Sequence, residues 1–381
     1  ETAPTSTSPT TSSKPSAYES AGIIGGVNDL TAPRQLGVGG PLVSPLGLGT
    51  MTFGAETAVD EAHRQLDRYV EAGGTFVDTA DVYSAGESER IVGGWLASRG
   101  ITDQVVVATK ARFRPPQGSP GASRRALQRC VDGSLDRLGV ECIDMFWVHG
   151  WDQHTPVEET LDTLSAMVRS GKISHVGWSN VTAWQLQRVV TTARLAGHVV
   201  PVGLQPQWNL LDRSVEVEVV PCCLSEGLGI APWSPLGGGW LTGKYRRDRP
   251  PTGSTRLGED PERGVEAYDV RDTDRTWGIL EVTERVADRH GVPMHHVAIA
   301  WLAARPGVST VLLGARSLAQ LEETLRAAAL QLSEQDLAEL TTASDPHLPE
   351  YPYGLIRRVM DVTVWDDLGL RLERENRGLR R

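Results

Sequence analysis

Short, continuously apolar runs alternate with longer amphipathic stretches along most of the chain. Runs that are apolar at every position are typical of strands covered on both faces, as in a parallel sheet between helices. The runs predict strands at residues 45–50, 75–80, 105–110, 143–149, 175–180, 202–207, 229–234 and 309–314.

The stretches between these runs repeat apolar residues at helical spacing. Several of them end at a glycine, which is the usual C-terminal cap of a helix. The glycines are Gly73, Gly100, Gly139, Gly171, Gly197 and Gly227. The predicted helices span residues 58–74, 87–100, 122–139, 156–171, 182–197, 214–227, 275–291, 295–307 and 318–329.

Strand and helix alternate often enough to predict a closed barrel. Eight strand-helix units favour an α/β fold of the (β/α)8 TIM barrel type over an open doubly wound sheet. We assign residues 33–342 to this single domain, residues 1–32 to a disordered Thr/Ser/Pro- and Gly-rich extension, and residues 343–381 to a C-terminal tail. The polar Pro/Gly-rich segment 244–264 predicts a flexible flap.

Composition narrows the possible partners. The 381 residues carry a formal net charge of −10 and no Lys/Arg-rich stretch, which argues against nucleic acid or an anionic membrane as partner. No apolar run approaches the roughly 18 residues of a membrane span, and the first twenty residues lack the apolar centre of a secretory signal. The four cysteines show no zinc spacing, so we expect a cytoplasmic protein without a metal site. The sequence does not decide whether the protein forms a homo-oligomer.

Four ionisable residues follow three successive predicted strands, where a barrel carries its chemistry. Asp78, Tyr83, Lys110 and His149 stand at these carboxyl ends. Any one alone has an ordinary explanation, because a lysine can cap a helix and a histidine can be a satisfied core residue. If all four are buried at one end of the barrel, they must offset the free-energy cost of burying each other's charges. Such a cluster predicts a functional site. Lys110 is also one of only four lysines among 38 basic residues, in a chain that otherwise uses arginine. A lysine kept at this position points to a use for its titratable amine.

Motifs around these residues carry a resemblance to a known family. The segments FVDTADVYSAGESERIVG, VVVATK, DMFWVHGWD, HVGWSN and IAPWSPLGGGWLTGKY resemble the aldo-keto reductase superfamily. The branch with aryl-alcohol dehydrogenase-like enzymes and potassium channel β-subunits is the most similar. The resemblance runs from about residue 33 to 325. It implies a (β/α)8 barrel that binds NADPH without a Rossmann domain, in agreement with the predicted strands.

The resemblance assigns a catalytic tetrad to Asp78, Tyr83, Lys110 and His149. Hydride transfer to a carbonyl carbon requires a general acid for the oxygen, and Tyr83 takes this role. The Lys110 ammonium would stabilise the phenolate, Asp78 would hold Lys110, and His149 would bind the substrate oxygen. Channel β-subunits carry asparagine at the position of His149, so this histidine favours a working reductase over an NADPH-binding regulatory subunit.

The resemblance also implies a full set of cofactor contacts. Polar groups at strand ends would hold the nicotinamide, and Trp208 would stack on it. Residues 233–238 would wrap the pyrophosphate, and Lys244 and Arg256 would clamp the phosphates. Arg316 would bind a 2′-phosphate. Thr324 replaces the asparagine that is common in the family. The cofactor residues are Thr50, Met51, Asp78, Ser179, Asn180, Gln205, Trp208, Trp233, Ser234, Pro235, Leu236, Gly237, Gly238, Lys244, Arg256, Gly314, Arg316, Gln320, Glu323 and Thr324.

The predicted substrate is a small carbonyl compound. Tyr83, His149 and two loop tryptophans, Trp151 and Trp240, would line its pocket. The sequence leaves open a simple aldehyde or ketone, or a sugar-nucleotide or natural-product intermediate. The pair His295–His296 has no acidic residue at metal-binding spacing, so a solvated helix start is favoured there.

Overall fold

The computed structural model describes residues 32–113, 120–253, 255–260, 264–360 and 364–372. Almost all of the predicted disordered extension, 1–32, lies outside this part. Eight parallel strands form one sheet in the order β10-β3-β4-β5-β6-β7-β8-β9, which confirms the predicted α/β (β/α)8 barrel. The strands are β3 (Leu46–Gly49), β4 (Phe76–Asp78), β5 (Val106–Ala111), β6 (Ile143–Val148), β7 (Ile173–Ser179), β8 (Gly203–Gln205), β9 (Gly229–Ile230) and β10 (Val311–Leu313).

Backbone hydrogen bonds between the two outer strands close the sheet. The amide of Ile230 donates to the Gly307 carbonyl at 2.8 Å, and the Leu312 amide donates to the Pro232 carbonyl at 3.0 Å. Closure leaves no free edge and brings all eight carboxyl ends to one mouth of the barrel.

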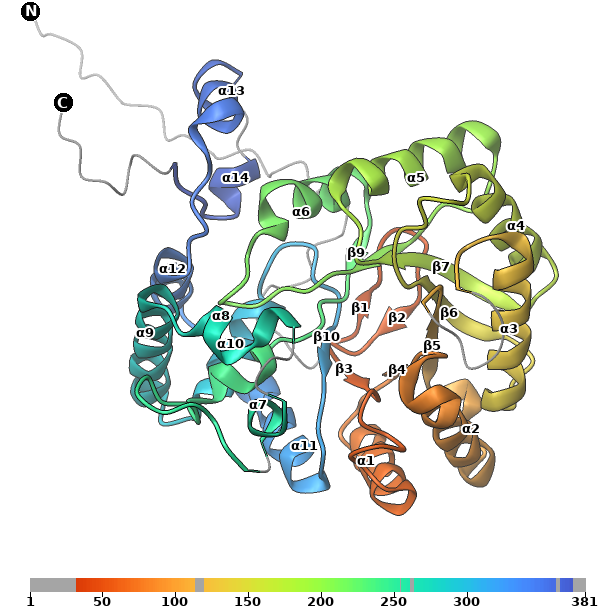
Figure 1. The fold of residues 1–381 in the computed structure, drawn as a ribbon, viewed down its shortest axis with the longest axis horizontal. Helices are drawn as coiled ribbons and strands as arrows, with labels where there is room; N and C mark the ends of the chain where they lie inside the picture. The colour runs from red at the N-terminus through yellow and green to blue at the C-terminus, as the bar shows by residue number, and fades with distance from the viewer. Residues whose placement is uncertain (1–31, 114–119, 254, 261–263, 361–363, 373–381) are drawn as a thin grey trace, which may run out of the picture.

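Helices surround the strands as a ring (Figure 1). Most of the long helices bury one face: α1 places Leu66 and Tyr69 against the sheet and keeps Asp60 in solvent, whereas α10 is buried almost all round. The long helices are α1 (Val59–Glu71), α2 (Glu87–Arg99), α3 (Arg124–Leu138), α4 (Val157–Arg169), α5 (Ala183–Ala196), α6 (Val215–Glu226), α9 (Asp274–His290), α10 (Met294–Ala303), α11 (Leu318–Leu325) and α12 (Glu334–Ala343). Short helical turns are η2 (Tyr83–Gly86), η3 (Thr102–Gln104), η4 (Gly237–Thr242), α7 (Arg256–Glu259), η5 (Gly264–Glu266), α8 (Tyr268–Arg271), η6 (Arg326–Ala329), η7 (Glu350–Gly354), α13 (Leu355–Val359) and α14 (Val364–Asp367).

An antiparallel hairpin, β1 (Arg34–Gln35) with β2 (Leu42–Val43), contributes to the barrel interior. Val43 of β2 and Leu36, which directly follows β1, pack into one buried cluster with Trp147 from β6. A Cβ on Gly177 would lie 2.5 Å from the Trp147 ring, so glycine is what lets this indole cross the barrel.

The described part of the C-terminal tail packs on the barrel wall. Trp365 in α14 donates from Nε1 to the Val217 carbonyl at 2.9 Å, and the Leu368 carbonyl accepts from Arg213 at 3.2 Å. Residues 373–381 of the predicted tail lie outside the described part. Among the residues described, no helix combines the length and hydrophobicity needed to cross a bilayer.

Candidate active site

The barrel brings the four predicted ionisable residues together at its mouth. Asp78 is the last residue of β4, Lys110 is in β5, and His149 directly follows β6. Tyr83 begins η2, in the loop after β4. Asp78, Lys110 and His149 are all buried.

The Lys110 ammonium has an acceptor for each of its three hydrogens. Its Nζ lies 2.5 Å from Asp78 Oδ2, 2.7 Å from the Thr79 carbonyl and 3.2 Å from the Tyr83 hydroxyl. Burial lowers the pKa of Lys110, but the charges of Asp78 and Tyr83 outweigh it, so the pKa lies above its usual value. Lys110 is therefore a fixed positive charge held against the Tyr83 oxygen.

A strained turn positions Tyr83. The next two residues, Ser84 and Ala85, both have positive φ angles, of 48° and 54°, and the Ser84 hydroxyl donates to the Phe53 carbonyl at 2.8 Å. Left-handed backbone is costly for non-glycine residues and gathers at functional sites. Because Tyr83 Oη accepts from Lys110, that bond does not use the phenol's own hydrogen.

His149 is held as a neutral imidazole facing Tyr83. Their ring centroids are 6.3 Å apart and nearly perpendicular, and the Phe113 ring lies 4.4 Å away on another side. Burial, with the positive charges of Lys110 and Arg112, lowers the pKa of His149 to about 2. Its Nδ1 is buried and has no hydrogen-bond partner among the described residues, which is unusual for a buried polar atom.

Polar residues from the next strands extend the site. Gln205 donates from Nε2 to Asp78 Oδ1 at 2.9 Å, and Ser179 donates to the Gln205 carbonyl at 2.7 Å. Asn180 donates to the His149 carbonyl at 3.0 Å and accepts from Trp233 Nε1 at 3.2 Å. Three predicted nicotinamide residues, Ser179, Asn180 and Gln205, thus form one network with the tetrad and Trp233.

The glycine-rich turn after β9 fits an extended phosphate chain. Gly237, Gly238 and Gly239 all have positive φ, and a Cβ on Gly239 would lie 2.6 Å from Lys244 Nζ. Two of the three amides are used inside the turn, since Gly237 donates to the Ser234 carbonyl and Gly239 to the Leu236 carbonyl, both at 3.0 Å. What the turn offers a phosphate is therefore its lack of side chains and the Lys244 ammonium beside it.

An unpredicted carboxylate lies against this turn. Glu266 is buried, accepts from Gln207 at 2.5 Å and Ser234 at 3.2 Å, and burial raises its pKa. It lies two residues beyond the predicted flap 244–264, where no spacing or periodicity marked it. An anion bound at this turn would have Glu266 as a neighbour.

Arg316 follows β10, as predicted, but it is already paired. Its guanidinium contacts the carboxylates of Glu56 and of Glu259, the latter at 2.9 Å. The Arg316 amide donates to Gln320 Oε1 at 2.9 Å, and Thr324 donates to the Gln320 carbonyl at 2.7 Å. The two acidic partners come from distant loops, which is why the sequence did not predict them.

Two tryptophans predicted to contact cofactor or substrate are buried in this structure. Trp208 is 0% exposed and donates from Nε1 to Glu216 at 2.8 Å, whereas Trp233 is partly exposed. Trp240 is also fully buried, with its ring stacked on that of Tyr268 at a centroid distance of 5.3 Å. Both side chains pack toward the helices, and the hydrophobicity of the sequence does not indicate that orientation.

The other predicted contacts lie near the mouth with mixed exposure. Thr50 is buried and bonded to Ser88 at 2.7 Å, whereas Met51 and Gly314 are exposed. Pro235 is buried and Leu236 partly so. Arg256 begins α7, and its side chain lies outside the described part of the structure.

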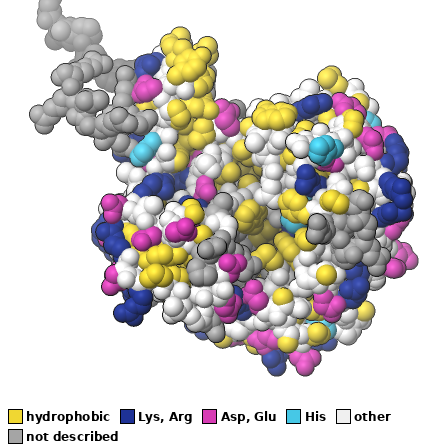
Figure 2. All heavy atoms as spheres, in the orientation of Figure 1, with side chains coloured by type: hydrophobic (Ala, Val, Ile, Leu, Met, Phe, Trp, Pro, Cys, Tyr) yellow, Lys and Arg dark blue, Asp and Glu magenta, His cyan; other side chains and the backbone are white. Residues whose placement is uncertain are grey.

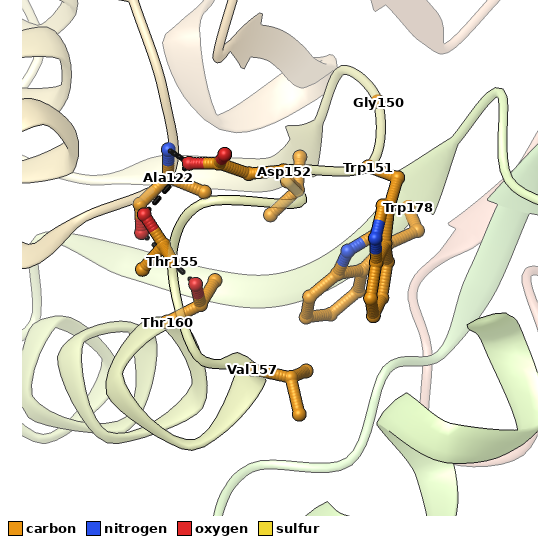
Figure 3. Close-up of a pocket in the computed structure, with 9 residues that line it drawn as sticks. Ala122, Gly150, Trp151, Asp152, Thr155, Val157, Thr160 and Trp178 are labelled. Atoms are coloured by element: carbon orange, nitrogen blue, oxygen red, sulfur yellow. Dashed lines mark hydrogen bonds between the residues drawn. The ribbon is translucent and has the colours of Figure 1, made fainter.

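Figure 2 shows a hollow near the centre of the molecule, partly lined by hydrophobic side chains. A small pocket of about 230 Å³, counted with its open mouth, lies by the loop after β6. In Figure 3, the rings of Trp151 and Trp178 form one side of it, and Asp152 and Thr155 lie on the other. Trp151 lines this pocket but none of the four ionisable residues does, so it is not the predicted substrate pocket.

Comparisons with known proteins show the family of this chain. The Aldo/keto reductase family matches residues 45–345. The chain is 34% identical to a norsolorinic acid reductase of Emericella nidulans, over 78% of this chain and 77% of the relative. It is 32% identical to an aryl-alcohol dehydrogenase [NADP(+)] of Phanerodontia chrysosporium (87% and 90%), and 33% identical to the oxidoreductase YrpG of Bacillus subtilis (80% and 93%). The chain belongs to the aldo/keto reductase family.

Proposed function

We propose that this protein is an NADPH-dependent reductase that converts an aldehyde or ketone to the alcohol, with Tyr83 as general acid. One observation carries the proposal: the buried Lys110 ammonium bonds both Asp78 and the Tyr83 hydroxyl, with neutral His149 facing the same phenol. This arrangement suits proton delivery to an oxygen held between Tyr83 and His149.

Each residue has a distinct task in this reaction. The bound nicotinamide cofactor supplies the hydride for the carbonyl carbon. Tyr83 donates its proton to the carbonyl oxygen, which leaves an alcohol and a phenolate that takes up a proton from solvent. Lys110 stabilises that phenolate, Asp78 keeps Lys110 charged, and His149 orients the substrate oxygen through a hydrogen bond.

An aromatic carbonyl compound is the substrate class that the observations favour. Phe113 packs on His149, and Trp151 lies beside the mouth of the barrel. The ring centroids of Trp151 and Trp184 are 5.6 Å apart. Two similar relatives are named for aromatic substrates, an aryl alcohol and norsolorinic acid. Flat aromatic walls bind planar rings through stacking and edge contacts.

The proposal is tested by titrating the protein with NADPH while following tryptophan fluorescence. Turnover of aromatic aldehydes, aliphatic aldehydes and keto-sugar nucleotides is then compared. We expect saturable quenching and the highest kcat/KM on the aromatic carbonyls. Absence of quenching would overturn NADPH binding, and a large preference for keto-sugar nucleotides would overturn the aromatic assignment.

Arg316→Ala is expected to weaken NADPH binding by about 10-fold or more, with a much smaller effect on NADH. A charge-assisted bond to a phosphate contributes roughly 1.5–3 kcal/mol, and only NADPH carries the 2′-phosphate. Fluorescence titration with both cofactors measures the ratio. Arg124→Ala, which removes an exposed arginine paired with Asp162 at 2.7 Å, is the control. Equal losses for NADPH and NADH would contradict the assigned role.

A further inference from the structure

Two consecutive histidines and a glutamate form a cluster where α10 meets α11. His295 and His296 are in the first turn of α10, and Glu323 is in α11. One nitrogen from each ring and one carboxylate oxygen lie within 4.8 Å of one another. The expectation of a solvated helix start is wrong for His296, which is only 4% exposed. The acidic partner missing from the local sequence is supplied by the fold.

The three side chains are held in place around a common point. His296 Nε2 lies 2.6 Å from the Glu323 carbonyl oxygen and 3.5 Å from Glu323 Oε1. The two imidazole rings are nearly perpendicular, with centroids 4.6 Å apart. His296 Nε2 is bonded to the Glu323 carbonyl, so His296 would bind a metal ion through Nδ1 or by giving up this bond. Donor atoms up to 4.8 Å apart must also move closer to share one ion at the roughly 2 Å bond lengths of a transition metal.

We propose that His295, His296 and Glu323 form a binding site for a divalent transition metal ion of the Zn²⁺ type. Two imidazoles and one carboxylate are ligands that Zn²⁺ takes with water in the fourth position, whereas Ca²⁺ and Mg²⁺ prefer oxygen alone. The competing cation is Arg326, which contacts Glu323 Oε2 at 2.8 Å and is 70% exposed. An exposed pair of this kind contributes little, so a metal ion can displace it.

The position of the cluster couples it to the proposed cofactor site. Glu323 is one of the residues assigned to the adenosine end, so this step rests on the proposed function. Met294, next to His295, packs on Gly243, where an added Cβ would lie 2.6 Å from its sulfur, and Gly243 precedes Lys244. A metal ion that takes the Glu323 carboxylate therefore removes a cofactor contact. By linkage, the metal ion and NADPH weaken each other's binding by the same factor.

The site itself is tested on metal-free, cofactor-free protein, with thiols blocked because Cys142 and Cys222 are partly exposed. Calorimetric titration with Zn²⁺ is expected to show one saturable site. His295→Ala and Glu323→Gln should each weaken it at least about 10-fold, the scale on which even outer-shell losses act. His198→Ala, which removes a partly exposed histidine elsewhere, should not. Binding that is absent, or unchanged in both variants, would overturn the site.

The coupling is tested by repeating the NADPH titration at saturating Zn²⁺. We expect NADPH affinity to fall several-fold in the wild type and to be insensitive to Zn²⁺ in His295→Ala. Unchanged affinity in the wild type would overturn the coupling and leave the metal site standing. If NADPH does not bind at all, the proposed function fails, while the calorimetric result still decides the metal site.

Discussion

Tyr83→Phe is expected to lower kcat by about 10²–10⁴-fold, the usual contribution of general acid catalysis. The substitution removes only the hydroxyl that accepts from Lys110 at 3.2 Å, and the ring stays in place facing His149. The lost interaction is realised mainly in the transition state, so kcat should fall while NADPH affinity changes little. Steady-state kinetics with an aromatic aldehyde and fluorescence titration measure the two effects separately.

A matched control is available in the C-terminal tail. Tyr353 donates its hydroxyl to Glu218 at 2.8 Å, far from the tetrad in sequence and on the outer wall, so Tyr353→Phe loses a similar O–H without touching the site. Its kcat should stay near wild type. If Tyr83→Phe keeps more than about half of the wild-type kcat, another group is the acid.

The pH dependence of kcat gives an independent check on His149. Its pKa of about 2 means that the imidazole stays neutral across the range in which the enzyme is folded. Titration of His149 should therefore add no inflection between pH 5 and 8, where an ordinary histidine titrates. An inflection in that range that disappears in His149→Asn would contradict the neutral, buried state.

The sequence was most informative where one physical rule decides the outcome. Strands buried on both faces must be continuously apolar, so all eight were predicted within a few residues. Parallel strands then place their carboxyl ends at one mouth, so Asp78, Lys110 and His149 had to converge once the barrel was assumed. The parallel register of β4, β5 and β6 produces that convergence directly.

The sequence did not predict the burial of side chains that could turn either way. Trp208 and Trp240 follow strands and are large enough to line a pocket, yet both are fully buried. The acidic residues beside the proposed cofactor site, Glu266 and the two partners of Arg316, come from loops and short helical turns without periodicity. Such contacts depend on loop paths, which no local pattern encodes.

Lys110 offers the second large effect, because it is both buried and at the centre of the tetrad. Lys110→Met removes the charge that stabilises the phenolate, so kcat should fall on the same scale as for Tyr83→Phe. It also leaves the Asp78 carboxylate buried without its ion pair, which typically costs about 3–5 kcal/mol of stability. Thermal unfolding must therefore accompany the kinetics. Lys172→Met, which removes an exposed lysine paired with Asp132 at 2.6 Å, should change neither.

Lys110→Arg separates charge from geometry. A guanidinium keeps the positive charge, but it is larger and planar, and the Lys110 site is 0% exposed with its three acceptors placed around one nitrogen. We expect kcat to stay well below wild type although Asp78 keeps a cationic partner. Near wild-type activity would show that charge alone suffices.

The double variant Tyr83→Phe with Lys110→Met decides whether the two residues act as one unit. If Lys110 works only through the Tyr83 oxygen, its removal costs little more once the hydroxyl is gone, so the kcat losses should be far from multiplicative. A double-variant loss near that of Tyr83→Phe alone is the expected result. Losses that multiply would mean that Lys110 acts on substrate or cofactor by a separate route, because the 3.2 Å contact would then carry no catalytic coupling.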